Sequence, residues 1–350
     1  MRKLFVFLGV VLATIGSAAS AQEVVSTAPM QMSSWGDAKT SEIVDYMPEI
    51  SLDTRLGYNQ NFSERSGRFA GDGLYLDING YLSPNLSYSL NHRIASSYYG
   101  DDITGFGATN WLTLTYEVGS FAFTAGKDAL LMGSFEYDAY DLDSYYDMNS
   151  AFYNALDCWQ WGVSAAWYPA DDHEVILQVA NSPFGEGFDM FSYAAGWRGA
   201  WDFYESYWTV NMWQYDAGKY AKALNLGNRF TFGDFMFDLE FMTRSDSMKG
   251  LFCDDFTFLF APSYEITDWC RAFSKFGWER NSSFFYGEDA DNIFWGIGAE
   301  FFPLKENRDL RLHAAWTSNE YTCGNALDIG VTWKMNLTRM FKGILTKKRN

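Results

Sequence analysis

The chain has 350 residues, and its 26 Lys and Arg against 44 Asp and Glu give a formal net charge of −18 at pH 7. Nucleic-acid binding requires clustered Lys and Arg opposite the phosphates, so this acidic balance excludes nucleic acid as a partner. Aromatic residues make up 19% of the chain. A soluble fold would have to bury this many rings, whereas a membrane β-barrel places them in girdles at both lipid interfaces.

The first 21 residues have the pattern of a secretory signal peptide. Met1-Arg2-Lys3 precedes an apolar run from Leu4 to Ile15, and Ala19-Ser20-Ala21 has the small residues of a cleavage site. Residues 22–47 are polar and without steady periodicity, which predicts a periplasmic N-terminal segment. No later stretch is apolar over the roughly 20 residues of a spanning helix, so any membrane insertion must use strands.

Residues 48–337 alternate apolar and polar side chains with a period of two, which is typical of β-strands. In the segment 235–244, for example, Phe235, Phe237 and Leu239 share one face. Asp238 and Glu240 share the other. Segments of this kind predict about sixteen strands, near 50–58, 74–82, 86–95, 108–118, 121–128, 158–168, 173–181, 190–201, 206–215, 223–232, 235–244, 256–265, 269–279, 292–302, 309–317 and 326–337.

The connections between these segments alternate between short and long. Short turns such as Ser83-Pro84-Asn85 and Gly233-Asp234 separate longer connections at 60–73, 97–107, 128–157, 245–255 and 280–291. Short periplasmic turns and long extracellular loops are the pattern of an up-and-down barrel. We therefore predict an all-β fold, a transmembrane antiparallel up-and-down β-barrel of about sixteen strands. A soluble double-sheet protein also alternates, but the many charged residues on the second face fit a polar lumen better.

The longest connection, 128–157, is acidic and rich in tyrosine, and we predict that it forms a constriction loop. Its candidate residues are Glu136, Asp138, Asp141, Asp143 and Asp147. Folded into the barrel, such a loop sets the size limit and favours cations. Remaining outside, it would merely carry solvated carboxylates.

Basic residues are expected to line the lumen opposite this loop. The predicted pore-lining residues are Arg55, Arg93, Lys127, Arg198, Arg229, Arg244, Arg271, Lys275, Arg311 and Lys334. Facing acidic and basic walls would orient dipolar solutes. The alternative is that these charges pair with one another and keep the lumen wet.

The sequence supplies no pattern for catalysis, for a metal or for a cofactor. His92, His173 and His313 are the three histidines, and only His313 is predicted to point inward. The four cysteines, Cys158, Cys253, Cys270 and Cys323, lack metal-binding spacing. Cys253 and Cys323 fall in predicted loops, where a disulfide is possible but its pairing is not set by sequence.

Several segments, in order along the chain, resemble the phosphate-selective porin O and P family. They are Gly126-Lys127 through Gly133 with Phe135-Glu136-Tyr137-Asp138, Asn181-Ser182-Pro183-Phe184, Leu226-Gly227-Asn228-Arg229-Phe230, Phe302-Pro303, Asn307 through His313, and Asp328 through Leu337. The resemblance implies a bacterial outer-membrane barrel, passive transport, a homotrimer and the passage of anions such as phosphate. The acidic loop at 128–157 departs from that pattern, as does the basic tail 338–350, which ends in Lys347-Lys348-Arg349-Asn350.

The expected function is therefore an outer-membrane porin without a cofactor, in contact with outer-membrane lipid. It admits small hydrophilic solutes or ions, and the preferred ion is left open, with phosphate as one candidate. The alternative is a structural or adhesive barrel with a plugged lumen.

Overall fold

The computed structural model describes residues 46–95, 105–139, 141–185, 189–251, 255–281, 290–304, 307–322 and 324–341. The predicted signal peptide, nearly all of the N-terminal segment, the tail beyond Phe341, Cys253 and Cys323 lie outside these ranges. Cys270 is a free thiol.

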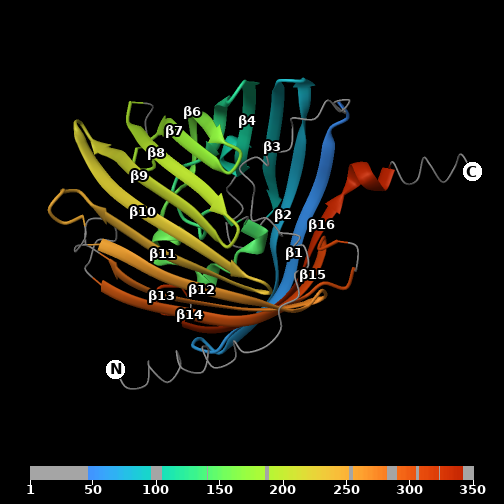
Figure 1. Cartoon of the computed structure of the whole chain (residues 1–350). Coiled ribbons are helices and arrows are strands. Elements are labelled where there is room, and N and C mark those ends of the chain that lie inside the picture. The colour runs from blue at the N-terminus through green and yellow to red at the C-terminus, as the bar shows by residue number, and fades with distance from the viewer. Residues whose placement is uncertain are drawn as a thin grey trace, which may run out of the picture.

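Sixteen antiparallel strands form a single closed barrel, as predicted (Figure 1). The strands are β1 (Glu49–Asn61), β2 (Ser66–Ser83), β3 (Leu86–Ala95), β4 (Thr109–Val118), β5 (Phe121–Ala129), β6 (Trp159–Ala170), β7 (His173–Asn181), β8 (Phe191–Trp201), β9 (Tyr204–Asp216), β10 (Lys219–Phe232), β11 (Phe235–Ser245), β12 (Asp255–Thr267), β13 (Cys270–Asn281), β14 (Ala290–Phe301), β15 (Leu310–Asn319) and β16 (Gly324–Asn336). Each strand pairs with its neighbours in sequence, and β1 pairs with β16 from Ser51 opposite Asn336 to Asn61 opposite Ala326. The last pairing leaves no strand edge open.

The turns at one end of the barrel are as short as the sequence predicts. Gly119-Ser120 joins β4 to β5, and Gly233-Asp234 joins β10 to β11. Both glycines have a left-handed φ, 59° at Gly119 and 60° at Gly233. A two-residue hairpin turn needs this conformation at its first position, and glycine adopts it without a steric penalty.

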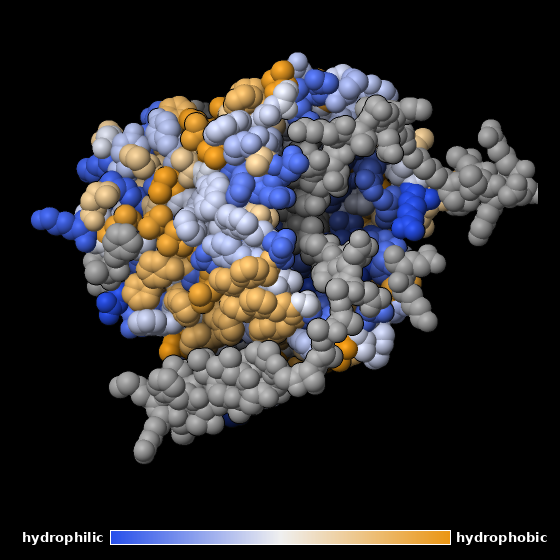
Figure 2. All heavy atoms as spheres, viewed as in Figure 1, coloured by the Kyte–Doolittle hydropathy of each residue, from blue (hydrophilic) through white to orange (hydrophobic). Residues whose placement is uncertain are grey.

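The strands present an apolar face to the outside of the barrel and a polar face to its interior. In β4, Leu114 is 49% exposed, whereas its neighbour Thr113 is 8% exposed because it points inward. Figure 2 shows hydrophobic residues gathered across the outer wall at β10–β13 and hydrophilic residues around the opening on the right. A belt of this kind matches the hydrocarbon of a bilayer.

One predicted connection is wrong. Residues 60–73 were expected to form a long loop, but β1 and β2 stay paired as far as Asn61 opposite Ser66, with a tight turn between them. The strand pair continues through Arg68 and Asp72. Polar residues can pair on both faces beyond the bilayer, where no lipid requires an apolar side, so the alternation there is lost while the strand persists.

Helical segments are few and short. Among the described residues they are the 3₁₀ turns η2 (Gly105–Ala108), η3 (Asp141–Asp143) and η4 (Tyr146–Met148), the one-turn helix α2 (Ala151–Ala155) and a helical turn at 337–341. Within the described ranges, no helix reaches the length and hydropathy needed to cross a membrane.

We expect Leu114→Arg to lower the free energy of unfolding more than Val118→Arg does. Both residues face outward on β4, but Leu114 lies in mid-strand and Val118 borders the turn. A charge at the bilayer midplane costs about 2–4 kcal/mol, against about 0–1 kcal/mol near an interface. Urea unfolding in lipid vesicles measures both variants. Equal costs would contradict the assignment of the outer face to lipid.

Candidate functional site

Loop L3, defined as residues 130–158, leaves β5 and folds into the interior of the barrel, where Figure 1 shows its green segments within the ring of strands. Leu130 and Met132 are almost completely buried and pack against Trp213 of β9. Leu131 and Phe135 form a second cluster with Tyr207, also of β9. These apolar contacts hold the first residues of the loop against the inner wall. The loop therefore does not take the solvated, outward position that the sequence left open.

Four salt bridges attach the loop to the wall. Asp138 Oδ2 lies 2.9 Å from an Arg198 Nη2 on β8. Glu136 Oε1 lies 2.7 Å from Lys275 Nζ on β13. The two carboxylate oxygens of Asp143 divide between two strands, with Oδ1 2.9 Å from Arg311 Nη1 and Oδ2 2.7 Å from Lys334 Nζ. Loop L3 therefore joins widely separated parts of the barrel circumference.

The helix α2 is anchored by capping of its N-terminus. The Ser150 side chain accepts a hydrogen bond from the Tyr153 amide at 3.0 Å, which identifies Ser150 as the N-cap. Glu136 accepts from the Ser150 amide at 2.9 Å and from its hydroxyl at 2.6 Å. Glu279 of β13 accepts from the Ala151 amide at 2.7 Å. Two carboxylates thus satisfy helix N–H groups that have no partner within the helix.

Arginine side chains of the wall also stack on rings of the loop. Their guanidinium carbons lie over the ring centroids of Phe135 (Arg229, 4.1 Å), Phe152 (Arg244, 3.9 Å) and Tyr145 (Arg55, 4.5 Å). Cation–π contacts of desolvated groups contribute about 2 kcal/mol each. Stacking and ion pairing together hold the loop against the wall along much of its length.

The charge of Asp143 is stabilised by its partners. Burial opposes ionisation, but Lys334 and Arg311 together hold the pKa of the Asp143 carboxyl well below its usual range. At neutral pH the carboxylate is therefore fully ionised between two cations.

The predicted wall cations are mostly brought together in ion pairs. Salt bridges to carboxylates are formed by Arg55, Arg198, Arg229, Arg244, Arg271, Lys275, Arg311 and Lys334. Arg93 donates to the side-chain oxygen of Asn110 at 3.0 Å. For these eight cations the geometry matches the alternative in which wall charges pair with one another.

Lys127 is buried and lies close enough to Arg93 for the two charges to interact electrostatically. It pairs with Leu112 of β4 and Trp161 of β6, whose side chains face outward. Its Nζ donates to the backbone carbonyl of Phe106 in η2 at 2.8 Å. The Lys127 side chain is only 8% exposed although its pairing partners face outward, so its place among the pore-lining residues stays a prediction.

The five predicted loop carboxylates have different environments. Glu136, Asp138 and Asp143 are paired as described, and the side chain of Asp141 lies outside the described part of the chain. Asp147 is half-buried, and no salt bridge to it is found among the described residues. Asp147 is close enough to Asp72 of β2 for the two charges to interact electrostatically.

Two anchoring carboxylates escaped the sequence-based selection. Glu279 is completely buried and caps α2, and Glu240 accepts hydrogen bonds from the Ser134 hydroxyl and, at 3.1 Å, from the Glu136 amide. Glu279 is four residues from Lys275 on the same strand, so the alternation of side chains places both on the inner face. That Glu279 binds the N-terminus of α2 becomes visible only from the path of loop L3, which the sequence does not give.

The histidines do not converge. His313 lies 3.3 Å from Asp328 Oδ1 and 3.4 Å from an Arg55 nitrogen, His92 contacts Thr109, and His173 stacks on Trp197. In the described part of the chain, no group of three or more His, Cys, Asp or Glu side chains could hold a metal ion.

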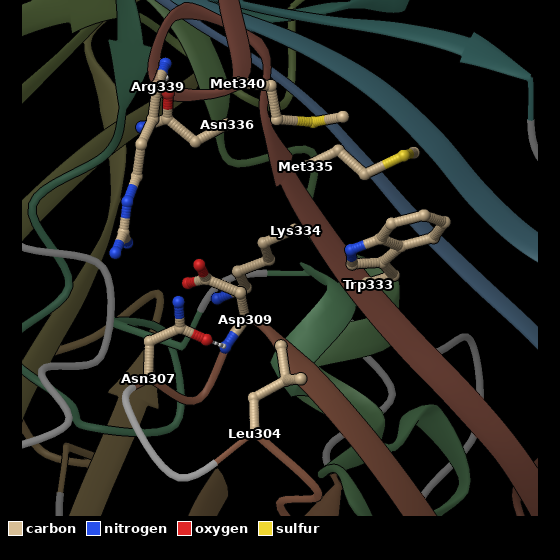
Figure 3. Close-up of a pocket in the computed structure, with 9 residues that line it drawn as sticks. All are labelled: Leu304, Asn307, Asp309, Trp333, Lys334, Met335, Asn336, Arg339 and Met340. Atoms are coloured by element: carbon tan, nitrogen blue, oxygen red, sulfur yellow. Dashed lines mark hydrogen bonds between the residues drawn. The ribbon is translucent and has the colours of Figure 1, made fainter. Parts of the chain in front are cut away.

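A pocket of about 310 Å³ lies at the end of the barrel where β16 finishes (Figure 3). Lys334 and Asn336 lie on one side of the strand and Trp333 and Met335 on the other. The Asn307 side chain accepts a hydrogen bond from the Asp309 amide at 3.2 Å at the facing turn. Since Lys334 also binds Asp143, this pocket borders the anchor of loop L3 from the turn side.

Neutralising Asp143 is expected to weaken the loop anchor. Asp143→Asn removes a charged acceptor from both Arg311 and Lys334, which costs about 1.5–3 kcal/mol. Asp147→Asn is the matched control in the same loop, with an expected change within about 0.5 kcal/mol. Urea unfolding of the two variants in vesicles measures both values. Equal destabilisation would argue against the Asp143 anchor.

The contribution of Asp143 should depend on pH in one direction. Its folded pKa lies below the ordinary value of about 4, so its stabilisation is present above that pH and is lost as pH falls through the folded pKa. We expect the difference in unfolding free energy between the wild type and Asp143→Asn to stay constant from about pH 7 to about pH 5 and to shrink below about pH 4. A difference that disappears between pH 7 and pH 5 would contradict the lowered pKa.

Comparison with known proteins gives structural matches only. No protein-family model matches the chain and no curated protein matches its sequence, so the resemblance to the phosphate-selective porin O and P family stays a prediction. OmpT, an outer membrane protein of Vibrio cholerae described in trimer form, is 12% identical with a TM-score of 0.56, over 82% of this chain and 98% of that one. A variant of the Rhodopseudomonas blastica porin is 11% identical with a TM-score of 0.57, over 83% of this chain and all of the other. At this identity the likeness establishes the fold, and the chain has the architecture of the 16-stranded porins of bacterial outer membranes.

Proposed function

We propose that this chain is an outer-membrane porin through which small hydrophilic solutes and ions diffuse passively. The observation that carries the proposal is loop L3, which lies inside a closed, lipid-facing barrel and is attached to the wall by Asp138, Glu136 and Asp143. A loop fixed in this way leaves a constriction of constant shape, which sets a size limit without a gate. Outer-membrane lipid covers the apolar belt.

The charges favour a weakly selective pore. Arg198, Lys275 and Arg311 are compensated by loop carboxylates, so they offer a phosphate little uncompensated positive charge. Passage of phosphate is thus possible but is not expected to be preferred. Asp147, which we place beside the conduction path, gives the constriction a mild preference for cations.

We further propose that the chain assembles as a homotrimer, because the similar Vibrio cholerae protein is described in trimer form. Mass measurement in detergent by light scattering tests this. The alternative of a structural or adhesive barrel with a plugged lumen has no support in the compared proteins, several of which are porins by name.

Recording from the purified full-length protein in planar bilayers tests the function. We expect an ohmic current, a reversal potential slightly on the cation side under a salt gradient, and a shift toward anions in Asp147→Asn. Ser87→Ala, which carries no charge change, is the control and should leave the reversal potential unchanged. Insertion without any current would reject the porin. Current without a shift in Asp147→Asn would place that carboxylate outside the path.

A further inference from the structure

Loop L3 approaches the wall unevenly. Its salt bridges go to β8, β13, β15 and β16, and its helix is capped from β13. Toward the arc formed by β3–β6 it presents Leu142, which packs against Tyr75 of β2 and against Trp111 of β4. In the described part of the chain no salt bridge joins the loop to β3–β6, and the apolar side chain of Leu142 faces that arc.

The inner face of the β3–β6 arc is rich in uncharged polar groups. Its hydroxyl and amide side chains include Ser87, Ser89, Asn91, Thr113, Thr115 and Thr124. Such groups both donate and accept hydrogen bonds. They can replace the hydration of a solute that carries many hydroxyls, but they compensate poorly for the lost hydration of an ion.

The charges of Asp77 and Arg93 are joined to each other through amides. Asn91 donates to Asp77 at 2.9 Å, Asn110 donates to Asn91 at 2.8 Å, and Arg93 donates to Asn110 at 3.0 Å. Asn91 and Asn110 are completely buried. A continuous network thus runs from a carboxylate to a guanidinium, and it reduces the field that either group exerts on a passing solute.

Trp111 lies beside Leu142 of loop L3, and its ring is held in a fixed orientation. Its indole Nε1 donates to Ser89 Oγ at 2.7 Å, and Ser89 Oγ donates to Asn79 at 2.6 Å. The ring of Trp159, the first residue of β6, lies 5.5 Å from it at an interplanar angle of 40°. Both tryptophans are half-buried. Rings held in this way need little ordering when a solute binds.

We infer that Trp111 and Trp159 form a binding position for uncharged sugars in the constriction. The inference rests on the proposed porin function and names its solute class. The apolar face of a pyranose ring stacks on the indoles, while its hydroxyls exchange hydrogen bonds with the β3–β4 wall. Uncharged sugars pass by this arc, and the paired charges on the opposite side serve to hold the loop.

The test is the conductance of the full-length protein in planar bilayers, titrated with maltose. We expect a saturable reduction of the ion current, and an increase of roughly tenfold in the half-blocking concentration for Trp111→Ala. Trp111→Phe keeps an aromatic face and should restore much of the affinity. Trp208→Ala, which removes an outward-facing tryptophan, is the matched control and should behave as the wild type.

Gluconate at the same concentrations serves as the charged probe and should block weakly. The sugar site is overturned if the wild-type current shows no saturable block by maltose, or if the block is unchanged in Trp111→Ala. Either result is compatible with the proposed porin function. Absence of current in the wild type rejects the porin itself, so the two failures are distinguishable. If Trp111→Ala fails to insert, Trp159→Ala replaces it, with the same expected loss and the same contradicting result.

Discussion

A strand in hydrocarbon has no water to bond its amides and carbonyls, so each of these groups must find a partner in a neighbouring strand. The pairing of β1 with β16 meets this requirement for the two strands that would otherwise be edges. Closure in turn fixes which side chains face lipid and which face inward. Every charged group that holds loop L3 from the wall occupies an inward position set by that closure, so the site depends on it as fully as the fold does.

The lipid requirement also explains why the sequence reveals so much of the fold. An outward face must be apolar wherever it meets hydrocarbon, so the alternation of residues such as Phe235, Phe237 and Leu239 predicts all sixteen strands. The prediction fails between Asn61 and Gly73, where β1 and β2 continue beyond the expected boundary. Polar residues on both faces carry no periodic signal there, although the backbone pairing is the same.

The site was only partly predictable. Composition singles out loop L3 and its carboxylates, and strand parity finds most inward cations, but the partners cannot be read from the chain. Asp143 and Lys334 are 191 residues apart, and Asp138 and Arg198 are 60 apart. Their contact depends on the path of the loop through the barrel. The same holds for Lys127, whose ammonium group donates to the backbone carbonyl of Phe106, a partner that its charge alone does not reveal.

The bond from Asp143 to Lys334 has a consequence for how the molecule is assembled. Lys334 belongs to β16, the strand that also seals the barrel against β1. Loop L3 can therefore complete its docking only after the C-terminal end of the chain has arrived, although the loop itself lies before the middle of the sequence. Contacts of such long sequence separation form late, because the entropy of closing the intervening chain must be overcome first. The Asp143 anchor of the loop and the sealing of the wall thus both need the last strand in place.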